Sequence, residues 1–177
     1  MDETTGEGDS ASEDADDGPA SDDTDERFLR RALDLAREAA ADGNTPFGSL
    51  LVHDGEVLAE STNTTVTDDD LTAHPELKLA RWAARELSGE ERRETTMYTS
   101  TYPCMMCSGA LAFAGLGRLV YSVDGETAAA LSPAGVNDDP PTTDYLREHG
   151  DVTVVGPLLE AAGEAVHREC WIQTTDD

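Results

Sequence analysis

Four residues near the middle of the chain carry side chains that bind metals or move protons. His74 and Glu76 are separated by one residue, and Cys104 and Cys107 follow in the sequence Pro-Cys-Met-Met-Cys. An imidazole and two thiolates are ligands that Zn²⁺ favours, and a site with three protein ligands keeps its fourth tetrahedral position open for water. Zinc at such a position lowers the pKa of that water to about 7. The pattern therefore predicts a hydrolytic zinc site, with Glu76 placed to carry the proton of the water.

The ligand set that this spacing predicts is His74, Cys104 and Cys107. Two simpler interpretations compete with it. A closed structural zinc site normally uses four protein ligands, and Cys170, the third cysteine, could close such a site in a non-enzymatic, zinc-stabilised binding module. A redox pair would explain the Cys-x-x-Cys spacing alone. Neither alternative gives a role to Glu76, so we favour the hydrolytic site.

The elements that must position these residues follow from hydrophobic periodicity and turn residues. We expect helices at Asp25–Ala41, Pro75–Leu87, Cys104–Ala114, Thr143–His149 and Leu158–Cys170, a helical turn at Thr127–Leu131, and strands at Phe47–Val52, Glu56–Thr62, Thr95–Thr101, Leu119–Val123 and Val152–Val155. Asp54-Gly55 is a hairpin signal, so the neighbouring His53 is expected in a turn and not at a metal. This order predicts an α/β protein, a three-layer α/β/α sandwich around a five-stranded mixed sheet.

Acidic residues dominate the composition. The chain of 177 residues has a net charge of −26, from 38 acidic and 12 basic residues, and Lys78 is the one lysine. Residues 1–24 contain no aromatic residue and no base, and cannot bury enough apolar surface to offset their ordering entropy, so we expect a disordered extension followed by one folded domain at 25–177. Because the acidity continues through the domain, we favour a protein of a salt-accumulating halophile over an ordinary protein with an acidic tail.

The same sequence shows no apolar run near the roughly 20 residues of a membrane span. Its first residues lack the basic and apolar regions of a secretory signal. Two of the three cysteines belong to the proposed zinc site, which argues against a disulfide framework. We therefore expect a cytoplasmic protein without a membrane partner.

The residues around the zinc pattern resemble the cytidine deaminase-like superfamily. The similarity is greatest to its nucleobase, nucleoside and tRNA-adenosine branch, which includes guanine deaminases and tRNA adenosine deaminases, and it covers roughly residues 27–171. It includes Pro46-Phe47-Gly48 and Asn63, which lies eleven residues before His74. The resemblance implies Zn²⁺ as cofactor, a homodimer, and Asn63, Phe47 and Phe113 as substrate-binding residues. Packing of Phe113 within its helix face is the competing expectation for that residue.

Two residues depart from the pattern of this superfamily. Pro75 stands where alanine is usual, and proline suits the first turn of a helix because its missing N–H loses no bond there. Tyr102 stands where relatives often have glutamate. This difference leaves the zinc chemistry intact, but it leaves the identity of the substrate undetermined.

The function that the resemblance implies is hydrolytic deamination of a free nucleobase or nucleoside, with release of ammonia. Guanine and cytosine are the leading substrates. The alternative is deamination of a wobble adenosine in tRNA, but binding of a polyanion relies on Lys and Arg, and the residues after position 26 hold 26 acids against 12 bases. Nucleic acid is therefore the less favoured partner.

Overall fold

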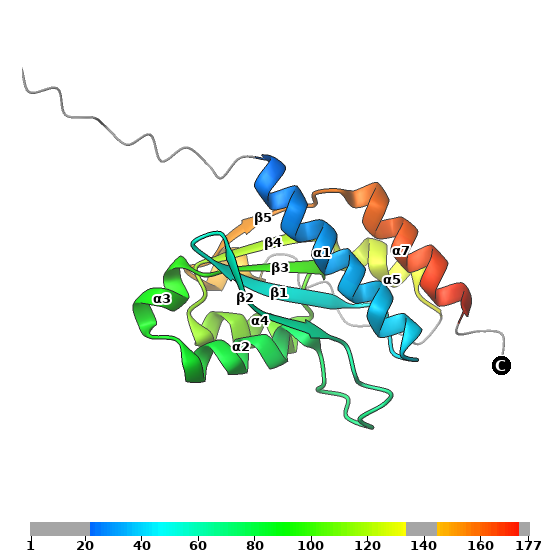
Figure 1. Cartoon of the computed structure of the whole chain (residues 1–177), viewed down its shortest axis with the longest axis horizontal. Coiled ribbons are helices and arrows are strands. Elements are labelled where there is room, and N and C mark those ends of the chain that lie inside the picture. The colour runs from blue at the N-terminus through cyan, green and yellow to red at the C-terminus, as the bar shows by residue number, and fades with distance from the viewer. Residues whose placement is uncertain (1–21, 134–144, 174–177) are drawn as a thin grey trace, which may run out of the picture.

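A computed structural model describes residues 22–133 and 145–173. Five strands form a single sheet, which lies at the centre of the molecule (Figure 1). The strands are β1 (Gly48–His53), β2 (Glu56–Thr62), β3 (Thr96–Thr101), β4 (Arg118–Val123) and β5 (Thr153–Val155), in the order β2-β1-β3-β4-β5. β1 is antiparallel to both β2 and β3, whereas β3, β4 and β5 run parallel. The predicted five-stranded mixed sheet is confirmed.

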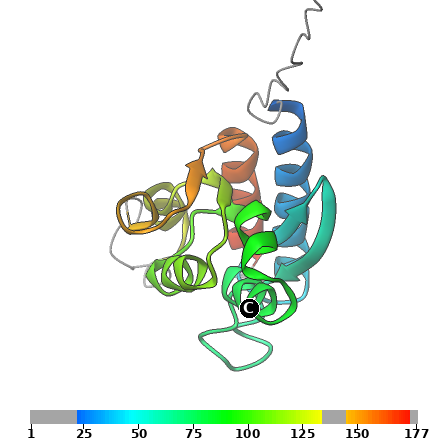
Figure 2. The same ribbon diagram turned by 90° about the vertical axis from the view of Figure 1, so that its left-hand side faces the viewer.

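Helices cover both faces of this sheet (Figures 1 and 2). α1 (Asp22–Ala41), α5 (Gly125–Leu131) and α7 (Glu160–Gln173) lie on one face; α2 (Pro75–Glu86) and α4 (Met105–Ala114) pack side by side on the other, with α3 (Gly89–Glu94) after α2 and α6 (Tyr145–His149) against α4. The arrangement is the predicted three-layer sandwich. Within the two described ranges, no helix combines the length and the apolar character that crossing a membrane requires.

Successive residues of the central strands point to opposite faces of the sheet, and both faces are buried. Leu50 of β1 packs with Phe28 and Tyr98 on the α1 side, whereas Leu51 packs with Met97 on the α2 and α4 side. Burying each of the large aliphatic side chains contributes about 1.5–3 kcal/mol. The two cores fix α2 and α4 against the sheet, and these are the helices from which the zinc pattern projects.

Two glycines permit close approaches that a larger residue would block. A Cβ at Gly48 would overlap Leu35 and the backbone of Ala36, so this glycine allows the start of β1 to lie directly against α1. A Cβ at Gly117 would overlap the backbone carbonyl of Arg93 at the end of α3. The first contact explains in physical terms the glycine of the Pro46-Phe47-Gly48 segment.

A buried ion pair joins α1 to the sheet. Asp25 is 3% exposed, and its carboxylate accepts hydrogen bonds from Arg118 Nη1 and Nη2 at 2.8 and 2.6 Å and from the Tyr98 hydroxyl at 2.7 Å. Burial opposes ionisation of Asp25, but the hydrogen bonds from Arg118 and Tyr98 outweigh it and hold the pKa of this carboxyl below its usual value. The start of α1 is therefore fixed by a charged contact.

Several element bounds differ from those expected. α1 begins at Asp22, three residues early, because acidic side chains are favourable at the positive end of a helix dipole. Residues 1–21 lie outside the described residues, as do most residues between the expected helical turn at Thr127–Leu131 and the expected helix at Thr143–His149. α3 was not expected. Directly after the predicted helix Pro75–Leu87, the Ser88 side chain caps a new helix in a reciprocal capping box with Glu91. Trp171 lies inside α7, not after it.

Candidate metal centre and active site

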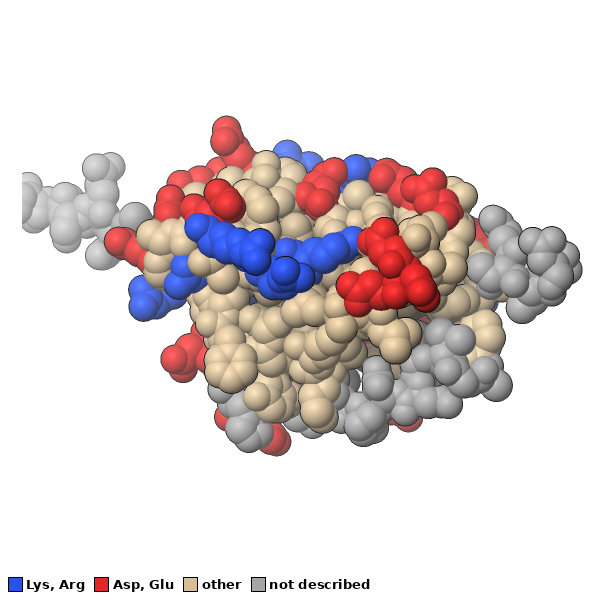
Figure 3. All heavy atoms as spheres, turned by 90° about the horizontal axis from the view of Figure 1, so that it is seen from below, with Lys and Arg blue, Asp and Glu red and all other residues tan. Residues whose placement is uncertain are grey.

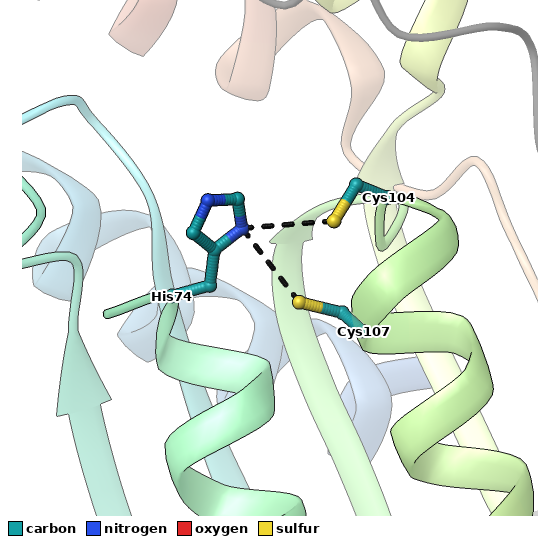
Figure 4. A group of neighbouring side chains, drawn as sticks. All are labelled: His74, Cys104 and Cys107. Carbon is teal, nitrogen blue, oxygen red and sulfur yellow. Dashed lines mark hydrogen bonds between the residues drawn. The ribbon is translucent and has the colours of Figure 1, made fainter. Parts of the chain in front are cut away.

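The three predicted zinc ligands meet at the N-terminal ends of two neighbouring helices. His74 is the N-cap of α2, Cys104 is the N-cap of α4, and Cys107 lies in the first turn of α4. Figure 4 shows the His74 ring directed at both sulfur atoms. Its Nδ1 lies 3.7 Å from Cys104 Sγ and 3.6 Å from Cys107 Sγ, and the three ligand atoms lie within 4.8 Å of one another. α2 and α4 thus bring together residues that are 30 positions apart.

The separation of these atoms fits a tetrahedral zinc ion. Zn–N bonds of about 2.0–2.1 Å and Zn–S bonds of about 2.3 Å at the tetrahedral angle place nitrogen and sulfur about 3.6 Å apart. The hydrogen bonds with Cys107 and His74 lower the pKa of the Cys104 thiol, and a helix N-terminus favours a thiolate further. The site therefore fits Zn²⁺ in the arrangement of its atoms and in the chemistry of its ligands.

The closed structural site is contradicted by the position of Cys170. This cysteine lies on α7 and packs with Leu33, Ala36 and Val166, on the face of the sheet opposite α2 and α4. Among the described residues, the group of His, Cys, Asp or Glu able to hold a metal consists of the three predicted ligands. One tetrahedral position is thus left for water or substrate.

Glu76 lies in the first turn of α2, beside the ligands but outside the ligand group. It is 4% exposed, and its Oε1 accepts a hydrogen bond from the Thr99 hydroxyl at 2.9 Å. Its Oε2 lies 3.8 Å from Cys107 Sγ. Burial raises the pKa of this carboxyl, partly offset by the backbone N–H of Glu76, by His74 and by Thr99. A carboxyl that is turned toward a metal site and holds its proton more readily than usual is suited to proton transfer.

Asn63 starts the loop that leads from β2 to His74, and it lies next to Phe47, the residue before β1. The Asn63 N–H donates to the Phe47 carbonyl at 2.9 Å, and the Asn63 side-chain Oδ1 accepts from the N–H and hydroxyl of Thr65 at 2.9 and 2.8 Å. Lys78 anchors the same loop by donating to the Thr62 carbonyl at 2.7 Å. With Oδ1 so engaged, the amide nitrogen of Asn63 is the group able to donate to a base.

Phe47 also contacts the last helix. Its ring packs edgewise against His167, with ring centres 5.6 Å apart, and against Trp171 at 6.3 Å. His167 is 1% exposed and pairs with the Thr101 hydroxyl at 2.9 Å, just before the Pro-Cys pair. The C-terminal helix therefore supports both Phe47 and the strand end that precedes the cysteines.

Phe113 is 93% exposed on α4, so the expectation that it packs within a helix face is wrong. Met105 and Met106 of the same helix are exposed as well, and α4 contains no charged residue. A contact between Phe113 and a substrate stays a prediction.

Sequence reasoning missed the residues behind the site. Thr99 and Ser49 lie on strands that were expected, but neither was singled out, and His167 was assigned only to a helix. One signal was present: Thr99, Ser100 and Thr101 place three hydroxyls in a row on a buried strand that leads directly to the cysteines. Buried hydroxyls require hydrogen-bond partners, so such a row indicates a polar network.

Three proteins are similar to this chain over most of its length. A probable cytosine deaminase of Schizosaccharomyces pombe is 28% identical over 149 residues, covering 81% of this chain and 90% of the relative. Guanine deaminase of Bacillus subtilis is 38% identical over 114 residues, covering 64% and 71%. The tRNA-specific adenosine deaminase of Haemophilus influenzae is 32% identical over 142 residues, covering 79% of each.

The fold and the zinc site agree with these similarities. The solved structure of guanine deaminase from Nitrosomonas europaea aligns with a TM-score of 0.68 at 26% identity, covering 83% of this chain and 84% of that one. The family described as cytidine and deoxycytidylate deaminase zinc-binding region matches residues 22–123, a range that contains all three predicted zinc ligands and Glu76. The chain therefore belongs to the zinc-dependent cytidine and deoxycytidylate deaminase family.

Proposed function

We propose that this deaminase acts on a free nucleobase or nucleoside, with guanine and cytosine as the leading substrates. The observation that carries the proposal is the buried Glu76 carboxyl, which lies beside a three-ligand zinc site with one open position. The relatives named as guanine and cytosine deaminases support both bases.

The reaction converts a ring C–NH₂ and water into a ring C=O and ammonia. His74, Cys104 and Cys107 would hold Zn²⁺, which when bound makes water acidic enough to supply hydroxide near neutral pH. Glu76 accepts the proton released from water and donates it to the ring nitrogen beside the attacked carbon. It then takes the remaining proton of the added hydroxyl and passes it to the departing amine, so that ammonia leaves and the ring carbon forms the C=O bond of the product.

Asn63 and Phe47 supply the groups that would hold the base. The Asn63 amide N–H can donate to a ring carbonyl or nitrogen, and the adjacent Phe47 ring offers an apolar surface. Both are held from behind, Asn63 by Thr65 and Phe47 by α7. Groups held in this way lose little freedom on binding, which favours affinity for a small, rigid ligand.

A wobble adenosine of tRNA is the second candidate, and one surface feature favours it. Figure 3 shows Lys and Arg side chains gathered in a stripe on the face that carries α2 and α3, beside a cluster of acidic side chains. Arg81 and Arg85 of α2 and Arg93 of α3 are exposed. A basic stripe can bind phosphates, but the acidic chain around it opposes a polyanion at low salt.

Ammonia release from a substrate panel tests the proposal. The panel contains guanine, cytosine, their nucleosides and a wobble-adenosine stem-loop, measured as kcat/KM at matched high ionic strength. We expect one of the small molecules to exceed the stem-loop. A stem-loop turned over more efficiently than every small molecule would replace the proposal by the tRNA candidate.

The role of Glu76 is tested with Glu76→Gln. Glutamine has nearly the same shape but cannot carry the proton, so kcat should fall by at least about 10²- to 10⁴-fold while one zinc per chain is retained. A Glu76→Gln enzyme with the turnover of the wild type would remove this residue from the mechanism.

We further propose that the protein is a homodimer in the salt-rich cytoplasm of a halophile. The net charge of −26 with a single lysine supports the salt environment, because high salt screens the repulsion between such chains. The uncharged helix α4, which exposes Met105, Met106 and Phe113, supports self-association. Light scattering across a potassium chloride series would give the mass, and a monomer at every salt concentration would contradict the dimer.

A further inference from the structure

Behind Glu76, two buried hydroxyls form a hydrogen-bonded chain across the sheet. Ser49 of β1 and Thr99 of β3 are opposite each other in the antiparallel pairing, and both are 0% exposed. The Ser49 hydroxyl donates to Thr99 Oγ1 at 2.9 Å, and the Thr99 hydroxyl donates to Glu76 Oε1 at 2.9 Å. The chain therefore runs from the sheet to the carboxyl proposed to carry the proton.

The position of these hydroxyls is unusual for their face of the sheet. Strand alternation places Ser49 on the side of Leu51, and Thr99 on the side of Met97, where both leucine and methionine belong to the apolar core under α2 and α4. A valine would fit at Thr99 by shape and by strand preference. Hydroxyls at these two positions thus replace apolar packing at the point where the first turn of α2 meets the sheet.

The contact fixes the rotation of the carboxyl. Thr99 holds Oε1 from the side of the sheet, so Oε2 is the oxygen that faces the zinc ligands, 3.8 Å from Cys107 Sγ. Ser49 in turn fills an acceptor site of the Thr99 hydroxyl, which leaves the Thr99 proton to be donated. That proton has a second acceptor, the Thr101 carbonyl at 3.1 Å, so the hydroxyl is held from several directions.

We propose that Thr99 is a positioning residue of the deamination reaction, which orients the Glu76 carboxyl toward the metal centre and is itself oriented by Ser49. The proposal rests on the proposed role of Glu76 as proton carrier. Misplacing a catalytic group by about 1 Å can cost roughly 100-fold in rate, so orientation by one hydrogen bond has a measurable effect.

Thr99→Val tests this role because valine preserves the shape and removes the hydroxyl. We expect kcat to fall about 10- to 100-fold, the effect of losing one hydrogen bond to a charged group, with little change in KM and with one zinc per chain. Thr99→Ser should restore kcat to within a few-fold of the wild type. Thr95→Val is the matched control, since Thr95 is equally buried on the same connection to β3 and its hydroxyl donates to the Glu91 carbonyl. The Thr95→Val variant should be less stable than the wild type but have the same kcat.

A double variant separates positioning from a general structural effect. In the Glu76→Gln background, Thr99→Val should cause no further fall in the residual rate, because the carboxyl on which Thr99 acts has been removed. Wild-type kcat in Thr99→Val, an equal fall in Thr99→Ser, or a further 10-fold fall in the double variant would each overturn the proposal.

Two further outcomes keep the test decisive. If Thr99→Val does not fold, Ser49→Ala takes its place, and a kcat within error of the wild type in that variant would overturn the proposal. Glu76→Gln measured alone separates the proposed role of Glu76 from the proposed role of Thr99. Full activity in Glu76→Gln refutes the proposed mechanism, whereas an inactive Glu76→Gln with a fully active Thr99→Val refutes only the role of Thr99.

Discussion

His167 is a buried imidazole whose hydrogen bonds require its neutral form. The indole N–H of Trp171 donates to His167 Nδ1 at 3.3 Å, and an indole N–H can only donate, so Nδ1 is the acceptor. The ring proton therefore lies on Nε2, which donates to the Thr101 hydroxyl at 2.9 Å. With 1% of the residue exposed, burial lowers the pKa of His167 to about 4. Acid should then weaken the contact between α7 and the strand that leads to the cysteines.

The size of the effect follows from proton linkage. An unfolded histidine has a pKa of about 6.5, so between that value and the folded pKa the unfolded chain binds the proton more readily. The stability that His167 contributes is present above pH 6.5 and is lost as the pH falls toward 4. With these two pKa values, the free energy of unfolding should drop by about 2 kcal/mol between pH 7 and pH 5 through this residue alone.

Urea unfolding of the wild type and of His167→Gln isolates this term. Glutamine can accept from Trp171 and donate to Thr101, but it does not titrate. Both proteins are measured at pH 7, 6 and 5 at one salt and zinc concentration. Between pH 7 and pH 5 the free energy of unfolding should fall by about 2 kcal/mol more in the wild type than in the variant, because all other titrating groups are common to both. Parallel losses in the two proteins would refute the assignment of a neutral, buried His167.

Four other substitutions have expected outcomes that follow from the structure. Cys104→Ala should lower zinc content below one per chain by elemental analysis, whereas Cys170→Ser should leave it unchanged; zinc lost with Cys170 would contradict the open site. Asp25→Asn should reduce the free energy of unfolding at pH 7 by about 3 kcal/mol in denaturant titrations, because it leaves the Arg118 guanidinium without its counter-charge. The difference in the free energy of unfolding between the wild type and Asp25→Asn should shrink as the pH falls through the lowered pKa of the Asp25 carboxyl. Gly117→Ala should destabilise by about 1–3 kcal/mol through overlap with the α3 backbone, seen as a lower Tm.

The group able to hold a metal could be predicted from the sequence because its signal is local. His74 and Glu76 are two residues apart, Cys104 and Cys107 three apart, and each pair begins a helix whose capping residues are readable. The sheet could be predicted for a related reason, since buried strands bounded by turn residues leave a periodic pattern. Ser88 and Glu91 show a local signal that was overlooked, because the capping box that starts α3 lies within four consecutive residues.

The residues behind the site could not be predicted in the same way, because their partners are distant in sequence. Thr99 meets Glu76 across 23 positions, and Thr101 meets His167 across 66. A threonine in a strand satisfies β preference whatever it contacts, so only the packing of α2 and α7 on the sheet reveals these bonds. For Phe113 only the competing expectation of packing was wrong, and it rested on the rule that a phenylalanine in an apolar helix is buried.

Orientation of Glu76 by neutral hydroxyls has a chemical consequence that a charged partner would not give. A lysine or arginine at the position of Thr99 would also hold the carboxyl, but an opposite charge at about 3 Å stabilises the ionised form and lowers the pKa. A carboxyl held so firmly as an anion accepts a proton from water poorly. The Thr99 hydroxyl orients the Glu76 carboxyl with a smaller electrostatic effect than a charged group would have. Burial, in contrast, raises the pKa of this carboxyl. The pair Ser49 and Thr99 thus fixes the geometry of the proposed proton carrier while leaving it able to gain and lose its proton.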